Sequence, residues 1–273
     1  MVSRVVVSLR SGTQGAVSIT QAHMISERRC ADLEMWSRLM MRSAALRRRK
    51  VPMQPLIVLL CIVSGSLDAI TFFTLGDVFA SVMTGNIVIV GVAAGTMDGQ
   101  LALACGVAIA GYIFGLVIGA WLIERWQQPA ESGIWPRRVS YLLTIQLGLL
   151  TVMNGIWIAS GSHPSEVLQL TLLPMAACAM GMQGIAVRRI RLPVSTTYMT
   201  GALTTLFDAA ASKRSFSHSE RNAFWGLPAL CLGAFIGSVI LAQFRYLAFV
   251  IPTAAVATVA ILSWVMDVET NEV

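Results

Sequence analysis

An aspartate inside a long apolar segment is the side chain of this sequence best suited to chemistry. Asp68 shares one helix face with Ser64 and Thr71, which stand four residues before it and three residues after it. An ionisable group at the centre of a membrane span costs roughly 3 kcal/mol on insertion scales, so it normally faces a cavity or a partner. The functional interpretation is a proton or cation site within a polar cavity. The structural alternative is an aspartate that is hydrogen-bonded to a neighbouring helix or lies near the end of its span.

The triplet Met-Thr-Gly occurs twice, each time in an apolar segment, and the two copies are 116 positions apart. The first copy contributes Thr84, Gly85 and the following Asn86 as candidate ligand groups, and the second contributes Thr200 and Gly201. A glycine in either copy can open a helix so that freed backbone groups and nearby side chains meet a ligand. The alternative is close helix packing, with each threonine bonded to its own turn.

The second half of the chain carries a polar stripe of its own. It consists of Thr197, Thr200, Thr204 and Asp208. Asp208 has the same two interpretations as Asp68, a coupling-ion site or a residue near a span end. Gln183 stands one residue before Gly184, which is the position that corresponds to Asp68, so the charge is not duplicated. These polar residues complete the candidate substrate site.

The composition requires a membrane around these residues. Hydrophobic residues make up 56% of the 273 and charged residues only 12%, and the mean hydropathy of +0.70 lies outside the range of soluble domains. A helical span needs about 20 mostly apolar residues. The sequence therefore predicts an all-α integral membrane protein with six to eight transmembrane helices. The apolar segments run over residues 55–74, 78–96, 101–123, 139–160, 167–187, 194–212, 223–243 and 246–266.

These segments divide into two repeats of four. Gly65 precedes the first triplet at the offset at which Gly181 precedes the second, and residues 114–119 correspond to 232–237 at an offset of 118. We therefore predict one membrane repeat over 54–160 and a second over 161–273, which ends in a short acidic tail. Such repeats often mark transporters whose site lies where the halves meet. Small residues four apart predict close helix packing at Gly111, Gly115, Gly119, Gly233 and Gly237.

Whether the two repeats have the same or the opposite orientation in the membrane depends on whether the two triplet segments cross it. If all eight segments cross, fourteen flanking basic residues divide seven to seven between the two sides, against the positive-inside rule. If the triplet segments enter and leave on one side, only Arg245 of the fourteen lies outside and the halves become inverted. Both triplet segments nevertheless reach about 20 residues, which is long enough to cross. The eight-span, parallel duplication is the preferred interpretation, and the six-span, inverted one is the alternative.

The net charge of +6 comes from the N-terminal tail. Residues 1–50 hold ten Lys and Arg against three acids. A basic cluster directly before the first span predicts a disordered, cytoplasmic tail over residues 1–53, with binding to anionic lipid as a second interpretation and nucleic-acid binding rejected. The scattered cysteines and histidines and the lack of a nucleophile, phosphate-loop or zinc motif predict no enzyme, no cofactor and no metal site.

Several of these motifs together resemble one known family. They are residues 65–69, Phe79 with 83–86, 180–183 with 187–189, and 195–203. The combination is similar to the YoaK-type family of bacterial multi-pass membrane proteins, a family of unknown function, over about residues 54–266. The resemblance implies a protein of the bacterial cytoplasmic membrane. It supplies no substrate, reaction or catalytic residue.

Two functions from different classes follow. The first is a secondary transporter or permease for a small-molecule substrate, coupled to protons or cations, with Asp68 and the two Thr-Gly segments lining the site. The second is a non-transporting membrane module, such as a sensor, a scaffold or a lipid-interacting protein. A polar cavity shared by both Thr-Gly segments would favour the first, and polar groups satisfied pairwise in a closed bundle would favour the second. Both have the lipid bilayer as partner, and a homo-oligomer is compatible with either.

Overall fold

The computed structural model of the chain describes residues 50–126, 135–190, 199–212, 218–265 and 267–269. The chain forms two units, Met1–Arg48 and Arg49–Val273, and the described residues all belong to the second. The tail predicted over residues 1–53 therefore falls almost wholly outside the described part. Just before the first helix, strand β1 (Lys50–Pro52) pairs in parallel with strand β2 (Asp267–Glu269), which follows the last helix.

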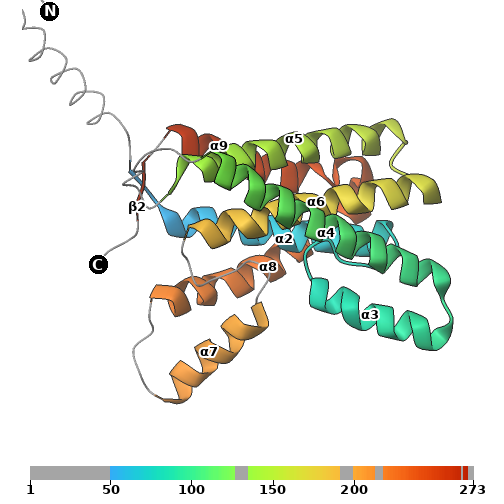
Figure 1. Cartoon of the computed structure of the whole chain (residues 1–273), viewed down its shortest axis with the longest axis horizontal. Coiled ribbons are helices and arrows are strands. Elements are labelled where there is room, and N and C mark those ends of the chain that lie inside the picture. Colours follow the sequence, from blue (N-terminus) through green and yellow to red (C-terminus); the bar gives the residue numbers. More distant parts are fainter. Residues whose placement is uncertain (1–49, 127–134, 191–198, 213–217, 266, 270–273) are drawn as a thin grey trace, which may run out of the picture. The chain divides into compact units, whose positions relative to one another are not determined.

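Apart from this pair of strands, the regular structure of the described residues is helical (Figure 1). The described part of the chain contains six helical segments that are long and apolar enough to cross a membrane, the sixth of which is Arg245–Val265. The prediction of an all-α integral membrane protein is therefore confirmed. The elements are α2 (Met53–Thr74), α3 (Met83–Thr96), α4 (Gly99–Arg125), α5 (Arg137–Ala159), α6 (Glu166–Arg189), α7 (Met199–Ala211), α8 (His218–Gln243), the 3-10 helix η1 (Arg245–Leu247) and α9 (Val250–Val265).

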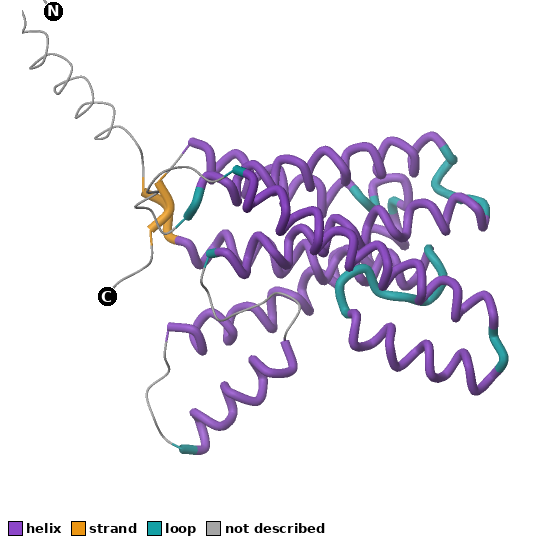
Figure 2. The backbone as a smooth tube through the Cα atoms, in the orientation of Figure 1, coloured by secondary structure: helices purple, strands orange, loops and turns teal. Residues whose placement is uncertain are grey.

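The helices of the two triplet segments are shorter than the rest. The prediction of a continuous segment over 78–96 is wrong at its start, because residues 75–82 leave the helical path and α3 begins only at Met83 (Figure 2). Gly76 and Asp77 turn the chain there with φ values of 105° and 57°. The 14 residues of α3 give about 21 Å of helix against a hydrocarbon core of about 30 Å. The described part of α7 has 13 residues. The length of α3 and the six candidate spans of the described residues favour the six-span alternative.

Two pairs of long helices lie in close contact through glycine. In the α2–α8 pair, a Cβ added at Gly233 would collide with the backbone of Ile62, and one added at Gly237 with that of Ser66. The contacts advance in the same direction along both helices, so α2 and α8 run parallel. Small residues let helix backbones approach this closely in membranes. The α4–α6 pair has the same geometry, with Gly115 against Cys178 and Gly119 against Met182.

The two pairs use corresponding residues. A Cβ at Gly65 would collide with the Leu230 carbonyl and lie 2.9 Å from the Ala234 nitrogen. A Cβ at Gly181, 116 positions later, would collide with the Tyr112 carbonyl and lie 2.9 Å from the Leu116 nitrogen. Tyr112 and Leu116 stand 118 positions before Leu230 and Ala234, which is the offset between residues 114–119 and 232–237. The nearest carbonyl oxygen and the nearest amide nitrogen thus come from corresponding residues in the α2–α8 and α4–α6 contacts.

These pairings separate the charged residues along the helix axes. The helices α4 and α6 are parallel, and α5, which connects them in the chain, runs in the opposite direction. The last residues of α4 and α6 and the first residues of α5 therefore lie at the same end of the bundle. This basic end carries Arg125, Arg137, Arg138, Arg188 and Arg189, with Glu124 among them, and the strand pair adds Lys50, Asp267 and Glu269 there. The other end, named the acidic end, carries Asp77, Asp98, Glu166 and Arg245.

Candidate functional site

The break between α2 and α3 is anchored by Asp68. Its Oδ1 accepts a hydrogen bond from the Ser81 backbone N–H at 2.6 Å, and its Oδ2 accepts one from the Ser81 hydroxyl at 2.5 Å. Both residues are buried. Asp68 lies about 9 Å of helix before the end of α2 at Thr74. The non-helical segment bonded to it therefore reaches into the bundle from the acidic end. Membrane proteins tolerate such non-helical backbone only where protein covers it.

Asn86 holds the same break from the side of α3. Its side-chain amide donates to the Phe79 carbonyl at 2.7 Å and accepts from the Phe79 N–H at 2.9 Å. The Phe79 ring stacks on Phe72 of α2, with 5.1 Å between the ring centroids, and would lie 3.2 Å from a Cβ at Gly85. Asn86 and Gly85 of the predicted site therefore shape the break, whereas Thr84 directly before them is exposed.

A second polar group lies where α2, α5 and α6 meet. Gln146 of α5 donates from Nε2 to Oε1 of Gln183 on α6 at 2.9 Å. Gln183 in turn donates from Nε2 to the Leu60 carbonyl at 3.0 Å and to the Ser64 hydroxyl at 3.1 Å on α2. Ser64, Gln146 and Gln183 are each 0% exposed. We name these three side chains the amide cluster.

The amide cluster retains an unused acceptor. The Oε1 atom of Gln146 is buried and has no hydrogen-bond partner among the described residues. Such an atom costs about 1–3 kcal/mol when it stays unpaired, and buried polar groups are normally satisfied by protein, water or a ligand. Sequence analysis missed Gln146, although an uncharged amide in the middle of the apolar segment 139–160 was a signal that could have identified it.

The second triplet segment does not join either group. α7 packs against α8 and α3 against α4, and the two short helices lie apart in Figure 1. Gly201 is half-buried, and Thr204 and Asp208 are exposed. Thr197 and the side chain of Thr200 lie outside the described residues. The structure brings Ser64 to Gln183 and Asp68 to the break held by Asn86, but the described residues of the two triplets do not meet in one site.

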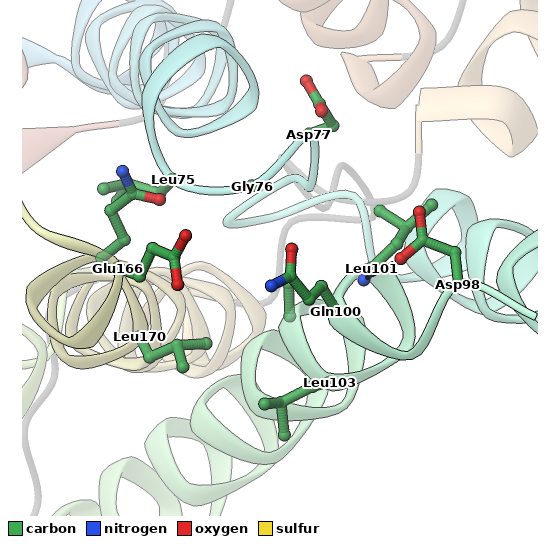
Figure 3. Close-up of a pocket in the computed structure, with 11 residues that line it drawn as sticks. Leu75, Gly76, Asp77, Asp98, Gln100, Leu101, Leu103, Glu166 and Leu170 are labelled. Atoms are coloured by element: carbon green, nitrogen blue, oxygen red, sulfur yellow. Dashed lines mark hydrogen bonds between the residues drawn. The ribbon is translucent and has the colours of Figure 1, made fainter.

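A cavity of about 420 Å³ opens at the acidic end (Figure 3). Its carboxylates come from Asp77 in the break, Asp98 before α4 and Glu166 at the start of α6. Asp98 also caps α4, since its Oδ1 accepts from the Leu101 N–H at 3.0 Å. Gln100 and Glu166 face each other across the space (Figure 3). None of the described lining residues is basic, so the field of the cavity favours cations and neutral solutes over anions.

Possible metal ligands do not gather at one place in the described part of the chain. Within the described ranges, no three His, Cys, Asp or Glu side chains lie close enough to hold a metal ion. The cysteines in those ranges are free, and they are Cys61, Cys105, Cys178 and Cys231. The arrangement is therefore one of hydrogen-bonding groups and surface carboxylates.

Comparison with known proteins extends over nearly the whole membrane part. A family model described as "Protein of unknown function (DUF1275)" matches residues 56–262, from the first turn of α2 into α9. The UPF0700 transmembrane protein YoaK of Bacillus subtilis (strain 168) is 28% identical over 168 residues, which cover 61% of this chain and 71% of that protein. No solved structure matches the chain.

Proposed function

We propose that this chain, which belongs to the DUF1275 family of proteins of unknown function, is a secondary transporter for a small solute in the bacterial cytoplasmic membrane. Its two halves are inverted repeats, each with three spans and one short helix. The amide cluster forms the substrate site, and the acidic cavity is the entrance from one side. The proposal keeps the predicted transporter and moves its site from the two triplets to the amide cluster.

The correspondence of the glycine contacts is the observation that carries this proposal. Gly65 meets a carbonyl oxygen and an amide nitrogen of α8, and Gly181 meets those of the corresponding residues of α4. If α3 and α7 do not cross, each half has three spans, and an odd number of spans forces the second half to run opposite to the first. Inverted halves provide two related conformations, one open to each side, which is how many secondary transporters achieve alternating access.

The charges at the helix ends orient the protein in this proposal. The positive-inside rule assigns the basic end, with the N-terminal tail, to the cytoplasm. The acidic cavity then opens to the outside. The segment of the break and α3 enters the membrane from the outside and leaves on the same side. The segment of α7 enters from the cytoplasmic side and leaves on that side. Arg245 is then the one basic residue of the fourteen on the outer side, where its Nε donates to the Ser162 carbonyl at 2.8 Å.

The amide cluster has the position and the chemistry of a substrate site. Ser64 lies near the middle of α2 and Gln146 near the middle of α5, which is close to the bilayer midplane. α2 and α6 are the first helices of the two proposed halves, so the cluster lies where the halves meet. Because its groups are uncharged and the Gln146 Oε1 has no partner among the described residues, a neutral or cationic solute with N–H or O–H donors fits it.

The two short helices differ in how they can be held. The break before α3 is fixed by Asp68 and Asn86. The corresponding positions in the second half are Gly184 and Ala202, whose side chains cannot form hydrogen bonds. These two positions therefore cannot supply the side-chain anchors that hold α3. In this proposal α7 is the short helix that moves during transport, and α3 stays in place.

Access to the amide cluster tests the proposal. Ser64→Cys in an otherwise cysteine-free chain is reconstituted into proteoliposomes and exposed to a small, charged thiol reagent, first on one side and then on the other. A transport site at Ser64 is expected to label from both sides, because alternating access opens it to each in turn. The matched control retains only the native Cys105, which is 0% exposed in α4 and is expected to stay unlabelled from either side.

A non-transporting module is the second candidate, and one observation favours it. The polar groups of the break are satisfied in pairs, Asp68 with Ser81 and Asn86 with Phe79, and the acidic cavity is lined by residues that flank α3 but by none of the described residues of α7. A sensor or scaffold would have this arrangement. If folded Ser64→Cys stays unlabelled from both sides, like the Cys105 control, the amide cluster is not a transport site and the second candidate replaces the first.

A further inference from the structure

The basic end carries a surface of arginines and aromatic rings that the transport proposal does not use. Arg125 is the last residue of α4, and Arg138 is the second residue of α5. The Trp126 and Tyr141 rings lie 5.4 Å apart between centroids and join the end of α4 to the first turns of α5. We name these four residues the α4–α5 surface.

The geometry of α5 adds to the positive charge of this surface. Its first turn contains no acidic residue, and Pro136 before it provides no side-chain cap, so the partial positive charge of a helix N-terminus adds to that of the guanidinium groups. The neighbouring carboxylate Glu124 is 3.2 Å from Arg189 of α6. The Nε atom of Arg138 is buried and has no hydrogen-bond partner among the described residues. An anion with several acceptor oxygens fits this arrangement.

An apolar face leads from this surface towards the middle of the membrane. Phe114, Val117 and Trp121 recur at helical spacing on α4 and are 58%, 61% and 55% exposed. Arg125 stands one turn further on, with its guanidinium carbon 5.4 Å from the centre of the Trp121 ring. Tryptophan and tyrosine are typical of the headgroup level of a membrane. The apolar face and Arg125 are therefore continuous on α4.

We propose that the α4–α5 surface binds the headgroup of an anionic phospholipid in the leaflet at the basic end. The phosphodiester accepts hydrogen bonds from Arg125 and Arg138, and an acyl chain lies along Phe114, Val117 and Trp121. A lipid satisfies both parts of the surface, whereas a free phosphate satisfies only the charged part. This inference does not depend on transport.

Lipid binding to the purified full-length chain tests the inference. The chain in a neutral detergent is titrated with phosphatidylglycerol or with phosphatidylcholine, and bound lipid is counted by native mass spectrometry. We expect preferential binding of phosphatidylglycerol, and a roughly 30-fold loss of that affinity in the double variant Arg125→Gln with Arg138→Gln. Arg188→Gln is the matched control, because Arg188 is an exposed arginine at the end of α6, and its affinity is expected to stay within about twofold of wild type.

Four outcomes would overturn the inference. The first is equal binding of the two lipids, and the second is a loss in Arg188→Gln as large as that in the double variant. The third is displacement of phosphatidylglycerol by millimolar inorganic phosphate, which would indicate a site for a free anion. The fourth concerns the double variant Arg125→Lys with Arg138→Lys, which keeps both charges and is expected to retain most of the affinity. If it loses as much as the glutamine variant, the arginines act through folding and not through headgroup charge.

Discussion

Replacing Gly115 by alanine is expected to destabilise the folded protein by about 3 kcal/mol, the upper end of the range for overpacked sites. The added Cβ would collide with the Cys178 carbonyl oxygen and lie 2.8 Å from its carbon. Because both are backbone atoms, no side chain can move aside to make room for the added methyl group. The backbones of α4 and α6 must therefore move apart. Gly233→Ala is expected to have an effect of the same size, because Gly233 meets the Ile62 backbone in the same way. Unfolding by denaturing detergent in mixed micelles measures both.

Gly106 provides the control within the same helix. It is exposed on α4, and a Cβ added there would have no neighbour within 4 Å. Gly106→Ala is therefore expected to leave stability unchanged or to raise it by up to about 1 kcal/mol through helix propensity. If Gly106→Ala and Gly115→Ala cost the same, glycine is not holding α4 against α6. If Gly115→Ala destabilises but Gly233→Ala does not, the two contacts are not equivalent and the proposed repeat loses its main support.

Asp68→Ala is expected to have the second large effect, again about 3 kcal/mol, because two buried donors of Ser81 lose their acceptors. The break should then loosen, and hydrogen exchange at the Ser81 amide should become faster. Asp68→Asn keeps one oxygen as an acceptor and is expected to cost about half as much. Thermal unfolding in detergent and hydrogen exchange measure the two consequences separately.

Asp77→Asn is the control for this series. Asp77 is an exposed aspartate in the same break, and asparagine tolerates its positive φ of 57°. Its substitution is expected to change stability by less than about 0.5 kcal/mol. Equal effects of Asp68→Ala and Asp77→Asn, or an unchanged exchange rate at Ser81, would contradict the anchoring role of Asp68.

The long helices were predictable from the sequence because hydropathy alone defines them. The segments expected over 55–74 and 101–123 correspond to α2 and α4, which end within two residues of those limits. The resemblance to the YoaK-type family, drawn from a few short motifs, is confirmed by the family match and by the Bacillus relative. The glycines expected to pack helices lie at helix contacts because a spacing of four places them on one face of the helix.

The break before α3 was not predictable from hydropathy. Leu75, Val78 and Ala80 are apolar and buried, so a hydropathy window cannot distinguish them from a helix. Their conformation depends on Asp68 reaching forward to Ser81. Gln146 was missed for a related reason, since its partner Gln183 lies 37 positions away on another helix. A contact between helices leaves no periodic signal in one sequence.

The sidedness of four single cysteines tests the inverted six-span arrangement most directly. They replace Asp77 and Met97, which flank α3, and Arg189 and Phe224, which flank the segment of α7, in a cysteine-free chain. All four positions are exposed. In intact cells, a membrane-impermeant thiol reagent is expected to label the cysteines at 77 and 97, and those at 189 and 224 only after permeabilisation. If 77 and 97 lie on opposite sides, α3 crosses the membrane and the inverted arrangement is wrong.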